Sequence, residues 1–140
     1  MLKKTITFTD YNGLERTEDF YFNLTKAEIM EMELSTTGGL TGMINKIVAE
    51  QNAPAIIKIF KELILKAYGE KSADGKKFMK KDKDGSPLYL NFEQTEAYSV
   101  LFMELATDAD AAAKFVNGIV PAEAQQQVQE KLQEQLKDKN

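Results

Sequence analysis

The chain contains neither histidine nor cysteine, and this double absence limits both how its fold is held together and what chemistry it carries. Histidine is the one side chain that ordinarily titrates near neutral pH, and cysteine supplies thiol nucleophiles and many zinc ligands. The usual zinc sites, thiol catalysis and histidine-based catalysis are therefore excluded. Of the 140 residues, 43% are hydrophobic, which is enough for an apolar core in one domain.

Charge and hydropathy argue against two classes of partner. The net charge is −4 and the pI is about 5.0, whereas phosphate binding requires a basic surface, so no nucleic-acid partner is expected. No apolar run approaches the roughly 20 residues of a membrane span. The start of the chain lacks the apolar segment of about 7–15 residues that a signal peptide needs. We expect an intracellular protein that does not enter a membrane.

Residues 2–22 have the sequence pattern of a β-hairpin. Residues 2–9 alternate apolar and polar side chains, as a half-buried strand does. The next four residues read Asp-Tyr-Asn-Gly, which is typical of a tight turn because Asn and Gly tolerate positive φ. Residues 14–22 supply the return strand and end in three aromatic side chains. Because an isolated hairpin is marginally stable in water, we expect it to pack against the helices that follow.

Five helices are predicted in the body of the chain. Thr25 and Glu28 form a capping box that starts the first helix. Asn91 is expected to cap the fourth helix, and Gly69 and Gly118 are expected to end the third and the fifth. The predicted helices span about residues 25–35, 40–51, 53–68, 92–106 and 109–117.

A polar, lysine-rich segment at about residues 70–90 separates the third and fourth helices. Two Asp-Gly turns within it allow a small second hairpin or a mobile surface loop, and the general behaviour of such polar loops favours the mobile, exposed one. The stretch 82–85 suggests a calcium loop, but Lys80 would then occupy the first ligand position and Asn91 the last, where acids are required. An ordinary turn is therefore favoured. Nearby acids partly cancel the lysines, so a solvated segment is favoured over a nucleic-acid site.

The end of the chain differs in composition from the rest. Residues 122–140 are rich in Gln, Glu and Lys, and their narrow apolar stripe includes Val128, Leu132 and Leu136. We expect a polar C-terminal helix that docks on a partner, or a frayed segment, appended to a globular domain of residues 1–121. The predicted fold class is α+β, with an N-terminal β-hairpin packed on a mostly helical body of about five helices.

No catalytic, metal or cofactor site is predicted. Carboxylate pairs, such as Glu28 with Glu31 and Glu93 with Glu96, lie at predicted helix starts, where acids interact favourably with the helix dipole. Acid–base catalysis needs a pair in a cleft with divergent pKa values. Capping is therefore favoured over catalysis, and we expect that the chain is not an enzyme.

Two apolar residues that fall outside the expected core, together with three methionines elsewhere in the chain, are the candidate protein-binding residues. At about 100° per residue, Leu65 falls on the charged side of its helix, and Met103 lies between Ser99 and Glu96. Single exposed apolar residues are normal, and a two-sided central helix is an equally ordinary interpretation. Methionines nevertheless suit an adaptable binding surface. The candidate residues are Met30, Met32, Met43, Leu65 and Met103.

The most specific signal is a pattern spread over four segments of the chain. These are residues 5–13, 18–28, 55–72 and 92–121, the last with Tyr98, Phe102, Leu105 and the stretch Phe115-Val116-Asn117-Gly118. Together they resemble phage tail assembly chaperones from phages with long, non-contractile tails, over most of residues 1–121. The similarity lies in a pattern across the domain and not in a catalytic signature. The lysine-rich stretch 76–90 is longer than in the family, so contacts of that loop are not carried over.

The resemblance implies a non-enzymatic helper of tail assembly. Such chaperones bind the long, aggregation-prone tape-measure protein before the tail tube polymerises around it, and several copies cover one client. The resemblance further implies a homo-oligomer, a longer frameshifted form of the chain and contact with the tail-tube protein. It places the chain in the cytoplasm of the bacterial host and not in the mature virion. The alternative is a structural tail component, a tail-tube or completion protein, which would have a richer β content.

Overall fold

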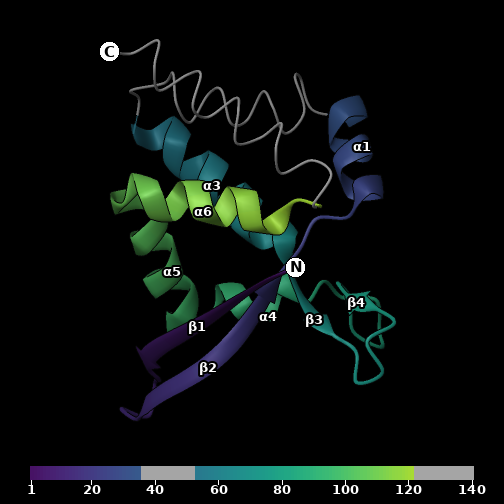
Figure 1. The fold of residues 1–140 in the computed structure, drawn as a ribbon. Coiled ribbons are helices and arrows are strands. Elements are labelled where there is room, and N and C mark those ends of the chain that lie inside the picture. The colour runs from purple at the N-terminus through teal and green to yellow at the C-terminus, as the bar shows by residue number, and fades with distance from the viewer. Residues whose placement is uncertain (36–52, 122–140) are drawn as a thin grey trace.

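The computed structural model describes residues 1–35 and 53–121, which form one small sheet and five helices (Figure 1). In chain order the elements are β1 Leu2–Thr9, β2 Glu15–Phe22, α1 Lys26–Ser35, α3 Ala53–Ala67, β3 Tyr68–Lys71, β4 Phe78–Met79, α4 Tyr89–Glu93, α5 Glu96–Thr107 and α6 Ala109–Ile119. The predicted α+β class, with an N-terminal hairpin on a mostly helical body, is confirmed. The predicted helix at 40–51 and the tail at 122–140 lie outside the described residues.

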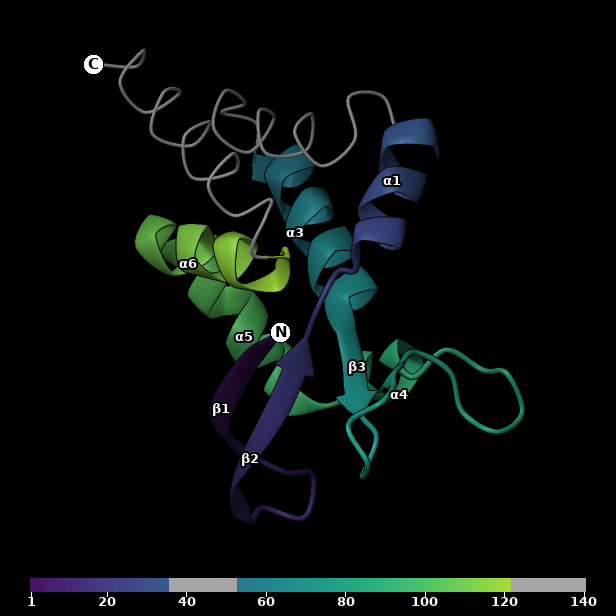
Figure 2. The same ribbon diagram turned by 45° about the vertical axis from the view of Figure 1, so that its right-hand side comes forward.

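The four strands form one antiparallel sheet in the order β1-β2-β3-β4. β1 and β2 pair along their whole length, from Leu2 opposite Phe22 to Thr9 opposite Glu15. β3 pairs with β2 only at the last two residues of β2, Tyr21 and Phe22. The rest of β3 pairs with β4. Because β3 is antiparallel to β2, both hairpins extend from the same side of the helical body, and the second splays away from the first, as Figures 1 and 2 show.

The lysine-rich segment forms the small second hairpin, the less favoured of the two alternatives that the sequence allowed. β3 and β4 are antiparallel, and an isolated bridge between Lys81 and Pro87 closes a second turn directly after β4. Asp74 and Asp82 each accept backbone hydrogen bonds inside the two turns. We call residues 68–87 the lysine hairpin. Its exposed lysines are Lys71, Lys76, Lys77, Lys81 and Lys83.

The core lies where the inner face of the β1–β2 ribbon meets the helices. Phe92 of α4 is at its centre: its ring stacks on Tyr68, with centroids 4.4 Å apart, and meets the edge of Phe22 at 5.7 Å. Full burial of a large apolar side chain stabilises a fold by about 1.5–3 kcal/mol, so this cluster fixes the ribbon to the helical body. Helices α3, α5 and α6 contribute the buried residues Leu63, Ile64, Leu101, Leu105, Phe115, Val116 and Ile119.

The predicted helix at 92–106 is in fact two helices, and Asn91 does not cap the longer one. α4 ends at Glu93, and α5 begins three residues later. Thr95 between them has extended backbone dihedrals, and its hydroxyl oxygen accepts a hydrogen bond from the N–H of Tyr98 at 3.3 Å. Thr95 is therefore the N-cap of α5. Asn and Thr are both good caps, and the sequence pattern alone selected the wrong one.

Gly69 and Gly118 were predicted to end helices, and this prediction is wrong. Each glycine instead lets another part of the chain pack closely against its backbone. A Cβ atom on Gly69 would lie 2.5 Å from Cε2 of Phe78 and 2.7 Å from the carbonyl oxygen of Met79, so β4 packs directly on bare backbone of β3. Gly118 lies inside α6, where a Cβ atom would be 2.9 Å from Cδ1 of Leu2. Both glycines supply space and not the positive φ that a helix C-cap uses.

Lys80 connects the lysine hairpin to the body. Its ammonium group donates to the carbonyl oxygens of Lys66 at 2.6 Å and Asn23 at 2.9 Å, and it lies 3.1 Å from the carboxylate of Glu28. These partners lie near the end of α3, just after β2 and in the first turn of α1. Burial lowers the pKa of Lys80, and the charge of Glu28 opposes that shift. One half-buried side chain thus joins four segments.

Candidate protein-binding surface

Two large apolar side chains stand on the exposed face of α5. Val100 is 40% exposed and Met103 is 57% exposed, whereas Ala97, Leu101 and Leu105 are buried on the other face. Residues three apart on a helix are neighbours on its surface, so Val100 and Met103 form one apolar patch. The amphipathic pattern of α5 therefore fixes which side faces the core and leaves this patch to solvent.

The turn of the β1–β2 ribbon extends this patch. Tyr11 is 78% exposed, and its hydroxyl donates a hydrogen bond to the carboxylate of Glu96 in the first turn of α5. That hydrogen bond raises the pKa of Tyr11. Glu96 lies one helical turn before Val100, so the four side chains follow each other along one line. We call Tyr11, Glu96, Val100 and Met103 the α5 ridge.

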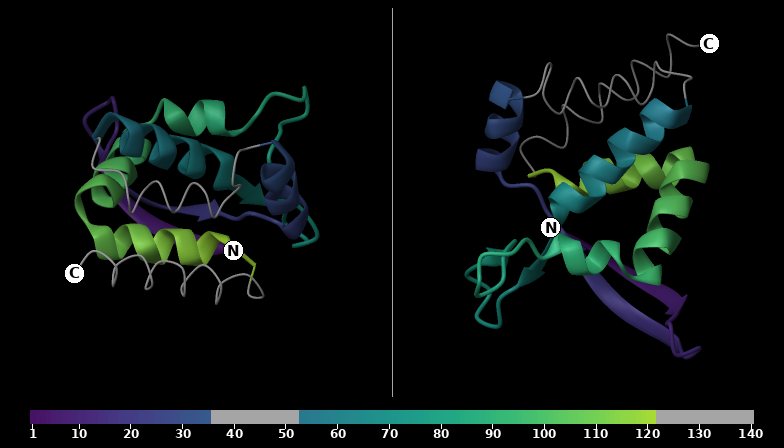
Figure 3. Two further views of the ribbon diagram at one scale, coloured as in Figure 1. Left: turned by 90° about the horizontal axis from the view of Figure 1, so that it is seen from above. Right: turned by 180° about the vertical axis from the view of Figure 1, so that it is seen from behind.

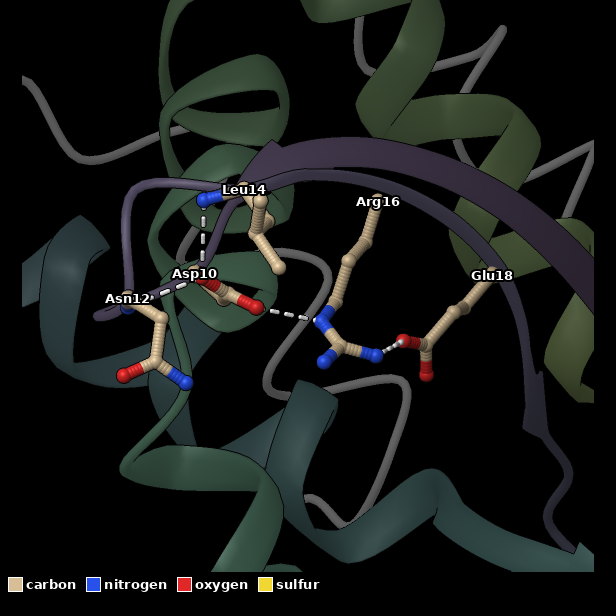
Figure 4. A network of polar contacts seen from close by, with 5 residues as sticks. All are labelled: Asp10, Asn12, Leu14, Arg16 and Glu18. Carbon is tan, nitrogen blue, oxygen red and sulfur yellow. Dashed lines mark hydrogen bonds and ion pairs between the residues drawn. The ribbon is translucent and has the colours of Figure 1, made fainter.

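A network of polar contacts fixes the turn that carries Tyr11 (Figure 4). One carboxylate oxygen of Asp10 accepts from the N–H of Asn12 at 2.8 Å and of Leu14 at 3.0 Å, and the other accepts from Arg16. Arg16 also pairs with Glu18. The hydrogen bond from Arg16, followed by that from Leu14, lowers the pKa of Asp10. The turn is therefore ordered although its side chains are exposed.

An ion pair and a cap hold α5 in place beside β1. Lys4 of β1 lies 3.0 Å from the carboxylate of Glu104 in α5. Thr95 caps the N-terminus of the helix, and the hydroxyl of Thr107 donates to the carbonyl oxygen of Met103 at its other end. The α5 ridge is thus built on a regular element that is fixed at both ends.

The charge around the α5 ridge is negative. Residues 88–113 include five acids and no lysine or arginine. Two of these acids are in ion pairs, Glu93 with Lys61 at 3.2 Å and Glu104 with Lys4. Within residues 1–35 and 53–121, no cation lies within ion-pair distance of Glu96 or Asp110. Glu96 is therefore the charged member of the α5 ridge, and its partner among the described residues is the hydroxyl of Tyr11.

The structure separates the residues that the sequence proposed for binding. Met103 lies on the α5 ridge, and Met30 is 66% exposed on α1. α1 and α5 lie on opposite sides of the molecule, as Figures 1 and 3 show, so these two methionines do not share a surface. Met43 lies outside the described residues.

Two of the proposed residues do not have the exposure that the sequence predicted. Met32 is only 1% exposed and belongs to the core. Leu65 is partly buried and packs against the core, and is not fully on the wet side of α3. Both side chains reach the core cluster through the packing of their helices, which a single helical stripe does not anticipate.

Sequence reasoning missed Tyr11 and Val100. Val100 comes three residues before Met103, so the two side chains point in directions about 60° apart on a helical wheel. The spacing that marked Met103 as exposed could therefore have marked Val100 as well. Tyr11 sits at the second position of the Asp-Tyr-Asn-Gly turn, where side chains point to solvent, so an aromatic residue there was a signal of its own. That Tyr11 meets Glu96, one helical turn before Val100, depends on the packing of the ribbon on α5 and could not be predicted from the sequence.

The described residues show no constellation that suggests catalysis. In residues 1–35 and 53–121, no three acidic side chains are grouped so that they would hold a metal ion. Burial raises the pKa of Tyr68 to about 12, which removes its hydroxyl from proton transfer near neutral pH. Within the same part of the chain, no helix has the length and apolarity needed to cross a membrane.

An exposed apolar ridge on a regular helix suits the class of proteins that act by binding other proteins. The sequence model of the phage tail assembly chaperone family matches residues 1–140, which is the whole chain. The chain therefore belongs to the phage tail assembly chaperone family, and the resemblance seen in the sequence is confirmed. Neither the curated proteins nor the solved structures give a significant match to it.

Proposed function

We propose that this chaperone binds the tape-measure protein and keeps it soluble while the tail is assembled, without catalysing a reaction. Family membership supports a role in tail assembly. The observation that carries the proposed binding mode is the α5 ridge, because an exposed apolar line on a helix is the surface on which an amphipathic client helix packs. Several copies bound along one long client would cover its apolar segments together.

The proposal includes where and with what the chaperone acts. It works in the cytoplasm of the bacterial host, is absent from the mature virion, and releases its client as the tail-tube protein competes for it. Its own copies and a longer frameshifted form are further partners. Residues 1–121 form the body that carries the α5 ridge, and residues 122–140 form an appended tail.

The proposal is tested by co-expression with the tape-measure protein encoded by the same phage, followed by affinity capture and light scattering. The expected result is a soluble complex with several chaperones per client, whereas the client alone precipitates. A client that stays insoluble, while this chain alone forms stable rings or tubes, would instead indicate a structural tail component.

Single substitutions then locate the binding surface. Met103→Lys places a charge on the α5 ridge and is expected to reduce the soluble client at least tenfold. Ile57→Lys is the matched control, because Ile57 is an exposed apolar residue on α3 with a similar exposed fraction of 46%. Met30→Lys tests the separate surface on α1. Equal loss in all three variants, or loss only with Met30→Lys, would remove the α5 ridge from the proposal.

A further inference from the structure

The α5 ridge is polar at one end and apolar at the other. Glu96 is the first residue of α5, Val100 follows four residues later, and Met103 follows three residues after that. At a rise of about 1.5 Å per residue, Val100 lies about 6 Å and Met103 about 10 Å along the helix axis from Glu96. A partner helix that covers the ridge therefore meets one charged group and two apolar side chains in a fixed order.

The polar end of the ridge is suited to a cation. The carboxylate of Glu96 accepts a hydrogen bond from the hydroxyl of Tyr11, and an ionised carboxylate has about four acceptor sites, so it can accept further bonds. The ring of Tyr11 is 78% exposed, and the face of an aromatic ring attracts cations. A lysine or arginine of a partner would therefore find a carboxylate and an aromatic ring side by side.

The surrounding charges favour a basic partner and do not oppose it. Residues 88–113 include five acids and no lysine or arginine. Three basic residues of β1, β2 and α3 are each already paired with an acid: Lys4 with Glu104, Arg16 with Asp10, and Lys61 with Glu93. The α5 ridge therefore complements a partner that combines apolar side chains with positive charge.

The helix dipoles favour one direction for that partner. The N-terminus of a helix carries partial positive charge and its C-terminus partial negative charge, so a basic residue is most favourable in the last turn of its own helix. Glu96 lies in the first turn of α5. A partner helix that runs antiparallel to α5 brings its last turn to Glu96, and its apolar residues then come earlier in its own sequence.

We propose that the α5 ridge selects client helices in which two apolar residues, three positions apart, are followed four positions later by a lysine or arginine. In the antiparallel direction, the first apolar residue lies on Met103, the second lies on Val100, and the cation lies between Glu96 and the ring of Tyr11. The inference rests on the proposed function and names the kind of client segment that this surface takes. An acid at the position of the cation is repelled by Glu96, so such a helix is rejected.

The test is fluorescence anisotropy of the full chain with three labelled, alanine-rich helical peptides of about 20 residues. The first peptide has leucine at positions i and i+3 and lysine at i+7. The second has glutamate at i+7, and the third has the lysine moved to i−4, which suits a parallel helix. The first should bind about fivefold more tightly than the other two, and about 500 mM NaCl should reduce its advantage over the second.

Charge reversal on the chaperone tests the assigned contact. Glu96→Lys should reverse the preference, so that the peptide with glutamate at i+7 binds more tightly than the peptide with lysine there. Glu62→Lys is the matched control, because Glu62 is an exposed acid on α3 outside the ridge, and it should leave the preference unchanged. Circular dichroism checks that both variants fold.

Three results would overturn the inference: equal binding of the three peptides, tightest binding of the third, or a preference for lysine that survives Glu96→Lys. Co-expression with the tape-measure protein separates this inference from the proposed function. A client kept soluble by the chaperone, together with equal binding of the peptides, would remove only the inference. A client that stays insoluble would remove the proposed function as well.

Discussion

The two hairpins of this protein each contain a turn with the same hydrogen-bond pattern, but different contacts hold each hairpin to the body. Asp10 in the β1–β2 ribbon and Asp82 in the lysine hairpin each accept hydrogen bonds from the N–H groups two and four residues later. The β1–β2 ribbon then buries Ile6 and Phe22, whereas the lysine hairpin exposes five lysines and is tied down by Lys80. Local sequence therefore sets the turn, and residues beyond it decide how firmly each hairpin is held.

The largest difference between the two hairpins is expected in the free energy of unfolding that is lost when each hairpin loses an aromatic ring. Phe22→Ala removes a fully buried side chain and should lower the free energy of unfolding by about 3–5 kcal/mol. Phe78 in β4 is only partly buried, so Phe78→Ala should cost at most about half as much. Urea denaturation measures both. Equal losses would mean that the two hairpins are anchored alike.

The polar anchor of the lysine hairpin is tested at Lys80. Lys80→Gln removes the ammonium group from three acceptors and should cost about 1–3 kcal/mol, because two carbonyls and a carboxylate lose their partner. Hydrogen exchange should rise in the first turn of α1 and in β4. Lys81→Gln is the control, since Lys81 is exposed, and it should change stability by no more than about 0.5 kcal/mol. Similar effects of the two variants would contradict the role given to Lys80.

Two glycines sharpen the comparison further. Gly69→Ala inserts a methyl group against a ring and a backbone carbonyl and should cost about 1–3 kcal/mol of stability. Gly118→Ala meets the end of the flexible Leu2 side chain and gains helix propensity, so it should be close to neutral. Thermal unfolding of the two variants tests this order, and a larger loss at Gly118 would reverse it.

The smallest expected effect is a pH effect at the turn of the β1–β2 ribbon. The folded-state pKa of Asp10 is below its ordinary value of 3.8, so its stabilising contribution is present above pH 3.8 and is lost as the pH falls through the lower folded-state value. The amide signals of Asn12 and Leu14 should therefore stay native-like at pH 3.8 in NMR spectra. Half-maximal change at pH 3.8 would contradict the hydrogen bonds assigned to Asp10.

Features that depend on local spacing were predictable from the sequence. The first hairpin follows from the alternation of residues 2–9, the four-residue turn and a return strand that ends in aromatic side chains. The capping box at the start of α1 is present, with Glu28 N–H donating to Thr25 Oγ1 at 3.1 Å and Thr25 N–H donating to Glu28 Oε1 at 2.9 Å. The boundaries of α3 and the start of α6 were also close, because proline, asparagine and aspartate give strong start signals there.

Features that depend on distant contacts were not predictable. Gly69 reads as a helix C-cap until β4 is known to pack on it, and Lys80 reads as one of several surface lysines until its three partners converge. The same limit applies to the binding surface. A helical wheel marks Met103 as exposed, but only the packing of α1 shows that Met32 is buried.

The most direct test of the proposed α5 ridge is hydrogen exchange of the chaperone alone and in complex with the tape-measure protein of the same phage. We predict slower amide exchange in α5, Glu96–Thr107, and in the turn that carries Tyr11. The exchange rates of the amides in α1, Lys26–Ser35, should not change. Slower exchange confined to α1, or none in α5, would contradict the assignment of the α5 ridge as the client-binding surface.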